Sequence, residues 1–409
     1  MSILKAAFCS LLVALTALES ADATDRPPQS PQWVAAWTAP ADQEGPVLTG
    51  KTIRQVVRPS AAGPSVRLRL SNLYGMSAVT IGPVRIAKHA GESAIRSATD
   101  RAVTFGGKPT ITIAQGADVL SDPVAFPLVA LEQVAISLYV VDGGKGSTLH
   151  GVGMQTAYIA SGQMTAAAKL ENSETDTSRY FLTDVEVAAP ADARTVVVLG
   201  DSITDGVGST QDRNRRWSDL LAERLHADPM LTSIAVVNSG IAGNRLLNDA
   251  SSPFVGPSVL TRLDRDVLSK PGLRWIVVLT GSNDISASDM LDTPKDKVSA
   301  QQIITGLQQL IARAHAKGIK VYGATLLPKA GVGKPFVHTP EAQAKRDAVN
   351  VWIRSSGAFD AVADLGRLMS DPARPDHLAP RYDSGDALHP NDAGFAAMAA
   401  AIDLRVLQD

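Results

Sequence analysis

The sequence predicts an antiparallel β-sandwich followed by an open, mostly parallel α/β sheet. Short runs that alternate apolar and polar residues, separated by glycine and proline, fill residues 33–187. Apolar runs of strand length then alternate with helical periodicities over residues 194–409. A chain of 409 residues, 45% hydrophobic and 20% charged, is long enough and apolar enough for two globular domains.

The N-terminal segment has the pattern of an export signal. Lys5 precedes the apolar stretch Ala6–Leu18, and a small-residue cleavage pattern ends at Ala23. We expect residues 1–23 to be a signal peptide, which places the mature protein in the periplasm or the medium. The alternative is a membrane anchor, but about 13 apolar residues fall short of the roughly 20 that span a bilayer. Cys9 is the only cysteine, so a cleaved chain excludes disulfides and zinc-thiolate sites.

Charge and hydropathy further limit the classes of partner. The formal net charge of -2 provides no long-range field for a polyanion, so we expect no nucleic-acid partner. No stretch after the N-terminal segment reaches the length of a transmembrane helix, so we expect no integral membrane contact. Residues 24–32 contain several prolines and are expected to form a flexible leader.

The β half is expected over residues 33–187. Val66–Leu70, Thr110–Ile113 and Val134–Leu138 alternate apolar and polar side chains, so each strand buries one face. Several such strands without helical periodicity between them favour a jelly-roll-like sandwich. Residues 188–193 read Ala-Ala-Pro-Ala-Asp-Ala and are expected to be a linker.

The second half is expected over residues 194–409 and alternates strands with helices. The predicted strands are residues 195–199, 233–237, 275–279, 320–326 and 361–363. Apolar residues at helical spacing predict helices at 217–225, 259–267, 303–314, from Thr339, and at 395–402. This order predicts a parallel sheet with helices on both faces, which binds ligands beyond the carboxyl ends of its strands.

Residues that can act as nucleophiles or as hydrogen-bond donors follow those carboxyl ends. The segments are residues 200–204 after the first strand, 238–245 after the second, 281–284 after the third, and 386–390 near the C-terminus. Hydrolysis of an ester needs a nucleophile, a base, a group that orients the base, and donors for the oxyanion. Ser202 is the candidate nucleophile, His389 the candidate base, and Asp386 is close enough in sequence to orient it. Helix capping is the alternative role for both Ser202 and His389.

These four segments resemble, in order and spacing, the conserved blocks of the SGNH hydrolases, also called GDSL esterases and lipases. The resemblance covers about half of the chain, and Ile203 replaces the leucine that usually follows the serine. It implies a flavodoxin-like three-layer α/β/α domain with a five-stranded parallel sheet. It also implies an oxyanion hole made by the backbone amides of Ser202 and Gly243 and the side chain of Asn283. No cofactor is implied.

Other chemistries have weaker signals. No serine lies in a G-x-S-x-G turn, and residues 331–335 have proline where a phosphate loop needs Ser or Thr. A metal held by Asp376, His377, Asp386 and His389 is an alternative, but these residues do not form a compact ligand motif. We expect no metal. Outside the catalytic set, Asp201 and Asn238 are expected to hold loops, and Arg245 is a candidate for lining the cleft.

Within the family, a β-rich domain before the catalytic half is similar to certain bacterial acetyl-xylan esterases. The resemblance implies an ester substrate such as an acetylated polysaccharide or oligosaccharide, from which acetyl or other short acyl groups are removed. A lipase, lysophospholipase or arylesterase is the alternative enzyme. A carbohydrate-binding or adhesion protein is the alternative of another class, with Trp33 and Trp37 stacking on sugar rings. The sequence leaves the oligomeric state open.

Overall fold

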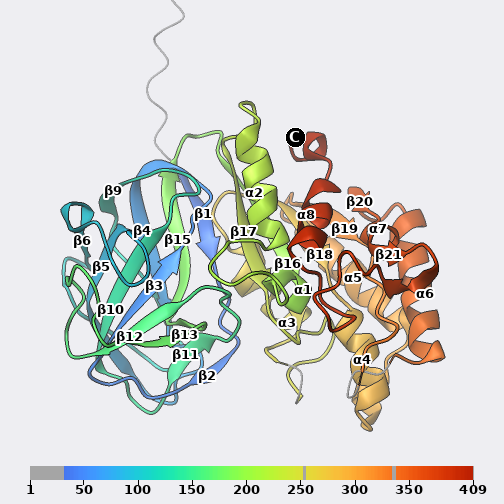
Figure 1. Ribbon diagram of the computed structural model, residues 1–409, viewed down its shortest axis with the longest axis horizontal. Helices are drawn as coiled ribbons and strands as arrows, with labels where there is room; N and C mark the ends of the chain where they lie inside the picture. Colours follow the sequence, from blue (N-terminus) through green and yellow to red (C-terminus); the bar gives the residue numbers. More distant parts are fainter. Residues whose placement is uncertain (1–31, 252–254, 334–337, 409) are drawn as a thin grey trace, which may run out of the picture. The chain divides into compact units, whose positions relative to one another are not determined.

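The computed structural model describes residues 32–251, 255–333 and 338–408, in which a β half precedes an α/β half (Figure 1). The predicted signal peptide, residues 1–23, and residues 24–31 of the predicted leader lie outside the described residues. Gln32, the last residue of that leader, instead begins a strand, because it pairs with Ala189. Within the described ranges, every helix is too short or too polar to cross a bilayer.

The β half is built from antiparallel sheets around one apolar core, which is the predicted sandwich. One sheet has the order β1-β15-β4-β8 and contains β1 (Gln32–Thr38), β15 (Leu182–Ala189), β4 (Gly63–Ser71), β8 (Asp118–Leu120) and β9 (Val124–Leu128), which also pairs with β4. The other has the order β13-β12-β3-β10-β5-β6 and contains β13 (Glu174–Asp176), β12 (Ala157–Ser161), β3 (Lys51–Val57), β10 (Val134–Asp142), β5 (Val79–Lys88), β6 (Arg101–Val103) and β7 (Ile111–Ile113), which also pairs with β5. A small third sheet joins β14 (Arg179–Tyr180), β11 (Ser147–His150) and β2 (Gln43–Gly45). The jelly-roll topology stays a prediction.

Both tryptophans that were considered for sugar stacking have partners within the protein. The guanidinium of Arg67 lies 4.2 Å from the ring centroid of Trp33. Trp37 is partly buried and packs against the sandwich core. Their rings therefore contribute to packing of β1.

The α/β half contains the predicted five-stranded parallel sheet, in the order β17-β16-β18-β19-β20. Its strands are β16 (Arg194–Gly200), β17 (Ile234–Gly240), β18 (Leu273–Leu279), β19 (Lys320–Ala324) and β20 (Ala361–Ala363). This order is the flavodoxin-like order that the family resemblance implied. The chain adds β17 on one side of β16 and then β18 on the other side. The carboxyl end of β16 therefore lies at the topological switch point of the sheet.

Helices cover both faces of this sheet, with α2 and α8 on one face and α3 and α5 on the other (Figure 1). The helices are α1 (Ser202–Asp205), α2 (Trp217–Ala227), α3 (Val259–Leu263), α4 (Ser282–Met290), α5 (Ala300–His315), α6 (Pro340–Ser355), α7 (Leu365–Met369) and α8 (Asp392–Ala400), and a hairpin joins β21 (Ser370–Asp371) to β22 (Arg374–Leu378). Thr339 caps α6, as its sequence predicted. Helix α4 was not predicted, because its sequence has no apolar stripe.

The two halves meet along β1 and β17. Thr38 Oγ1 donates to the carbonyl of Asn238, and Ser60 Oγ donates to the carbonyl of Val236. The expected linker is shorter than predicted, because Ala188 and Ala189 extend β15 by pairing with β1. Both halves belong to one unit that covers all described residues, so the division of the chain near residue 190 stays a prediction.

Candidate active site

The central strands of the parallel sheet end at the same level. Gly200, the last residue of β16, pairs with Gly240 of β17 on one side and Leu279 of β18 on the other. The segments that follow these strands therefore leave the sheet side by side. These are the segments that carry Ser202, Gly243 and Asn283.

Ser202 is the first residue of α1, which begins directly after β16. The cap of this helix is Asp201, whose Oδ1 accepts the N–H of Ile203, so Ser202 is not the capping residue. Gly200 permits the abrupt turn, because a Cβ there would lie 2.3 Å from Thr204 Oγ1 and 2.4 Å from the carbonyl oxygen of Leu279. The side chain of Ser202 is thereby free to interact with another part of the chain.

That interaction is with His389. His389 Nε2 lies 2.9 Å from Ser202 Oγ, and its Nδ1 lies 2.5 Å from Asp386 Oδ2. The carboxylate requires a hydrogen on Nδ1, which leaves Nε2 as the acceptor toward Ser202. Asn391, not His389, caps α8. The structure therefore brings together the three residues that the sequence predicted as nucleophile, base and orienting acid.

Asp386 remains a carboxylate over a wide pH range. Partial burial alone would raise its pKa, but the His389 imidazole and the N–H groups of His389 and Leu388 outweigh burial and hold the pKa well below its usual range. A charged Asp386 keeps His389 in the tautomer that can accept a proton from Ser202.

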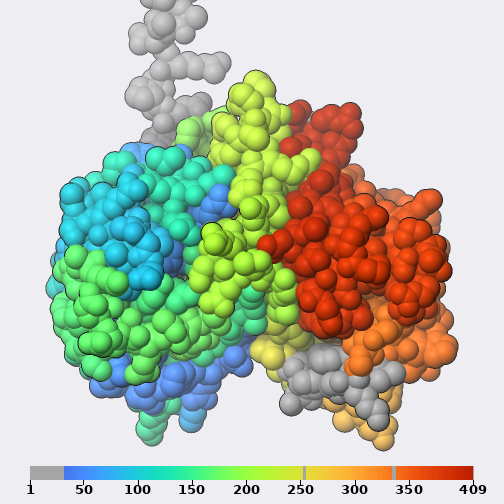
Figure 2. All heavy atoms as spheres, viewed as in Figure 1, coloured from blue at the N-terminus to red at the C-terminus, as the bar shows by residue number. Residues whose placement is uncertain are grey.

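The loop that carries Asp386 and His389 is held by local bonds. Asp383 Oδ1 accepts the N–H groups of Gly385 and Ala387. The chain that follows α1 also binds next to it, since Thr210 donates its N–H and its hydroxyl to Asp392. Figure 2 shows the yellow-green chain after α1 meeting the red C-terminal chain at the surface.

The residues proposed for the oxyanion hole lie in adjoining segments. Gly243 has φ +75°, a left-handed conformation that favours glycine. Asn283 Nδ2 donates to the carbonyl of Asn244, 2.9 Å away, which holds its amide next to the Gly243 segment. A side-chain amide has a second N–H, so Asn283 can make this bond and donate once more.

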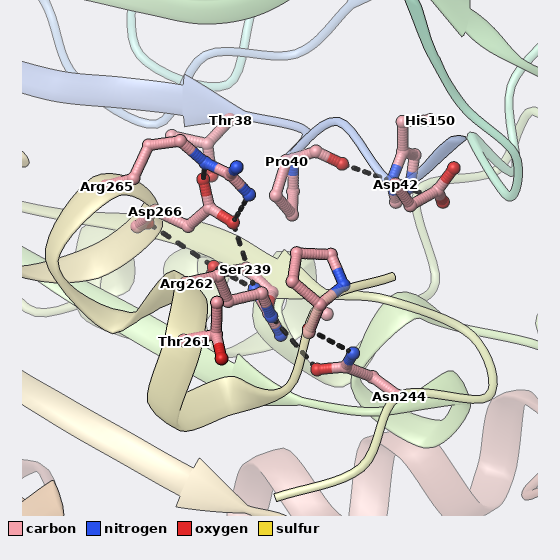
Figure 3. A network of polar contacts seen from close by, with 12 residues as sticks. Thr38, Pro40, Asp42, His150, Ser239, Asn244, Thr261, Arg262, Arg265 and Asp266 are labelled. Atoms are coloured by element: carbon pink, nitrogen blue, oxygen red, sulfur yellow. Dashed lines mark hydrogen bonds and ion pairs between the residues drawn. The ribbon is translucent and has the colours of Figure 1, made fainter. Parts of the chain in front are cut away.

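A fully buried arginine that was not predicted from the sequence holds the ends of β16 and β17 (Figure 3). Arg262 donates to the carbonyls of Gly200 and Ser239, to Ser239 Oγ, and to Asn244 Oδ1. Asn244 Nδ2 in turn donates to the carbonyls of Val255 and Pro257. Arg262 therefore joins the strand that leads to Ser202 with the segment that contains Gly243.

Asp284, in helix α4 after the third strand, anchors the same segment. Its carboxylate accepts the N–H groups of Leu246 and Leu247 at 2.7 and 2.9 Å. Burial raises the pKa of Asp284 to about 6, although these two donors and Arg245 oppose the shift. Its position next to Asn283 in the sequence was the signal that could have revealed it.

Two further side chains were expected at the cleft or its loops. Asn238 holds a loop as predicted, because it donates to the carbonyl of Thr204 and accepts the N–H of Gly240. The expectation that Arg245 lines the cleft is wrong: its side chain is buried and donates to Asp296 Oδ1 at 2.6 Å. The carboxylate of Asp296 attracts the guanidinium inward.

The side chains that were the alternative metal ligands form two separate pairs. Across residues 32–251, 255–333 and 338–408, no group of three or more His, Cys, Asp or Glu side chains is arranged to hold a metal ion. His377 pairs with Asp376 at 2.8 Å, and His389 pairs with Asp386.

Comparisons with known proteins bear on this half of the chain. Residues 198–397 match the model of the GDSL-like Lipase/Acylhydrolase family. No curated protein matches the chain by sequence. Similar solved structures are a carbohydrate acetylesterase from Sinorhizobium meliloti (17% identity, 52% of this chain and 98% of that one, TM-score 0.40), an acetylxylan esterase from Geobacillus stearothermophilus (19%, 52% and 94%, 0.38) and a GDSL-like lipase from Bacteroides thetaiotaomicron (21%, 52% and 88%, 0.37). The family match alone identifies residues 198–397 as a GDSL-like lipase/acylhydrolase domain, and the chain is an ester hydrolase.

Proposed function

We propose that this ester hydrolase acts through an acyl-enzyme on Ser202. The observation that carries the proposal is the 2.9 Å contact between His389 Nε2 and Ser202 Oγ, with Asp386 on the other ring nitrogen. A hydroxyl next to an oriented neutral imidazole is the usual means of making serine nucleophilic.

In the proposed mechanism, Ser202 Oγ bonds to the ester carbonyl carbon while its proton passes to His389 Nε2. The N–H groups of Ser202, Gly243 and the Asn283 side chain donate to the oxygen that becomes negative. Collapse of this intermediate expels the alcohol, which takes the proton from His389. Water then attacks the acyl carbon while its proton passes to His389, and His389 returns this proton to Ser202 Oγ as the bond to the acyl group breaks and the carboxylic acid leaves.

We further propose that the alcohol portion is a carbohydrate and that the acyl group is acetyl or similarly short. Large exposed apolar side chains would favour a lipid, but those of the described residues all belong to segments other than 200–206, 238–247, 281–290 and 383–391, which carry the candidate site. They are Val47, Met76, Val129, Val141, Met230, Val351 and Val362. The described chain near the His389 loop instead presents polar side chains, including Thr210 and Asp392. A polar border suits a hydroxyl-rich alcohol.

A substrate panel tests this proposal. Acetylated xylan oligosaccharides, aryl esters of increasing acyl length, and lysophospholipids are assayed with the wild type and with Ser202→Ala. We expect turnover of the acetylated sugars and of the short aryl esters, a decline with acyl length, and no turnover by the variant. Cleavage of lysophospholipids alone would show that the carbohydrate proposal is wrong and favour the lipase alternative.

We also propose that the chain is exported, on the basis of the signal pattern in residues 1–23. The test is N-terminal sequencing of protein from the periplasm and the medium of a bacterial host. A mature chain that starts at Thr24 is the expected result. Full-length protein confined to the cytoplasm would contradict export.

A further inference from the structure

A histidine of the β half contacts the α/β half inside the protein. His150 ends β11, and its side chain is only 4% exposed. Its Nδ1 lies 2.9 Å from the carbonyl oxygen of Pro40 and 3.4 Å from Asp42 Oδ2. Its Nε2 lies 3.0 Å from Asp205 Oδ1, and Asp205 belongs to α1. Figure 3 shows His150 beside Asp42 and Pro40, close to the Arg262 network.

The surroundings of the ring require a cationic imidazole. Its two nitrogens face the carbonyl oxygens of Pro40 and Val152 and the carboxylates of Asp42 and Asp205. These groups accept hydrogen bonds, so both ring nitrogens must carry hydrogens. Burial alone would lower the pKa of His150, but Asp205 and Asp42 outweigh it and raise the pKa to about 9, against opposition from Arg216.

Asp205 connects this imidazolium to two parts of the active site. It is the last residue of α1, the helix that begins with Ser202, and its N–H donates to the carbonyl of Asp201. Its Oδ2 accepts the N–H of Ala242 at 2.9 Å, and Ala242 precedes Gly243. One carboxylate thus binds His150 with one oxygen and the Gly243 segment with the other.

Tight packing around Asp205 couples the position of α1 to that of the segment after β17. A Cβ on Gly240 would lie 2.3 Å from the backbone nitrogen of Asp205, so β17 and α1 are in close contact there. Interiors packed at this density move as rigid pieces, not by local compression. A shift of Asp205 is therefore expected to move both the start of α1 and the segment after β17.

We propose that His150 is a positioning residue for the hydrolase site. It fixes Asp205 so that Ser202 and the N–H of Gly243 keep the spacing that attack and oxyanion binding need. The β half thereby completes the catalytic half, in addition to any role in binding substrate. The proposal rests on the function proposed for Ser202 and Gly243, but His150 itself does not touch substrate.

A purely stabilising role would not require this arrangement. Removing charges from water is costly, and apolar residues of similar volume often stabilise a core as well as a buried ion pair does. The directional bonds of Asp205 to Ala242 N–H and His150 define a geometry that apolar packing would not. The nearby cations Arg216 and Arg262 belong to the α/β half, whereas His150 and Asp42 come from the β half.

The test compares His150→Leu and His150→Gln with the wild type, using an aryl acetate as substrate. A fluorophosphonate titrates the reactive serine, so that kcat is expressed per competent site. We expect kcat of His150→Leu to fall about 10- to 100-fold, with KM changed by less than about threefold, because misplaced catalytic groups affect the transition state most. His150→Gln, which can still donate to Asp205, should recover part of kcat.

Arg54→Met provides the matched control. Arg54 is also a buried cation of the β half, but it donates to Ser137 and to the carbonyls of Ser93, Thr165 and Ala167, all within that half. This variant should lower Tm while leaving kcat per competent site unchanged. An equal loss of kcat in Arg54→Met, or wild-type kcat in His150→Leu, would overturn the proposal.

Hydrogen exchange separates this inference from the proposed function. Amides in residues 202–207 and 241–247 should exchange faster in His150→Leu than in Arg54→Met, whether or not a substrate has been found. Unchanged exchange in both segments would overturn the positioning role. An inactive wild type together with faster exchange in His150→Leu would overturn the proposed function and support the positioning role.

Discussion

Ser202 and His389 meet at one hydrogen bond but come from regions that are built in different ways. Ser202 follows a buried strand, and the segments beside it are anchored by the buried side chains of Arg262 and Asp284. His389 lies in a loop held by short-range bonds, where the Asp386 side chain is 49% exposed.

Because of this difference, substitutions near Ser202 and near His389 should affect the stability and the activity of the protein to different extents. The anchors on the Ser202 side, Arg262 and Asp284, are buried charges, so removing one leaves partners unsatisfied in the interior and weakens the fold. On the His389 side the Asp386 carboxylate is half exposed, so it can be changed with little effect on folding. Substitutions on the two sides are therefore expected to have different ratios of lost activity to lost stability.

The largest expected effect is on activity alone. Ser202→Ala and His389→Ala should each reduce kcat by about 10⁴- to 10⁶-fold, and the double variant should be no worse, because the two residues act as a unit. Tm should stay within a few degrees of the wild type. Steady-state kinetics and thermal unfolding measure both quantities, and additive losses would contradict the common mechanism.

The next largest effect is on stability. Arg262→Met should lower the free energy of unfolding by about 3 to 5 kcal/mol, because the carbonyls of Gly200 and Ser239 lose a buried donor and the carboxylate of Asp266 loses one of its two arginine partners. Asp386→Asn on the base side should cost less than about 1 kcal/mol while still reducing kcat. Urea unfolding compares the two variants. Equal losses of stability in the two variants would contradict the proposed difference between the Ser202 and His389 regions.

Asn283→Ala should reduce kcat by about 10²- to 10³-fold, which corresponds to roughly 3 to 4 kcal/mol of transition-state stabilisation. The loss should fall on kcat more than on KM, because the oxyanion exists only in the transition state and intermediate. Initial rates over a range of substrate concentration provide the measurement. A rise in KM with unchanged kcat would assign Asn283 to substrate binding instead.

The smallest expected effect is a pH dependence of stability. The pKa of His150 rises from 6.5 unfolded to about 9 folded, so its contribution is complete below pH 6.5 and is lost as pH rises through about 9. The loss is on the order of 3 kcal/mol, and it depends on the facing charges of Asp42, Asp205, Arg216 and Arg262. Urea unfolding between pH 7 and 10 should show this decline in the wild type and not in His150→Leu. The same decline in both proteins would assign it to another group.

The sequence alone predicted which segments of the chain meet at the candidate site. Ser202 and Asn283 follow apolar runs that could only be buried strands, and parallel strands bring their carboxyl ends together. Asp386 and His389 are three residues apart, so their pairing needed only a turn. These features are local in sequence. The order of the four segments, which resembles that of the SGNH hydrolases, implied the oxyanion-hole residues.

The anchoring residues could not be predicted in the same way. His150 and Asp205 are 55 positions apart in different halves, and no periodicity connects them. Arg262 lies in a short helix, where a single arginine usually points to solvent. Helix α4 was missed because its buried side chains are mostly small or polar, including Asp284 and Ser286.

Fluorophosphonate labelling followed by peptide mapping tests the central claim most directly. The reagent bonds to an activated serine, so the account predicts one adduct, on Ser202, in the wild type, and greatly slowed labelling in His389→Ala. An adduct on another serine, or labelling of Ser202 at the same rate without the His389 imidazole, would contradict the account.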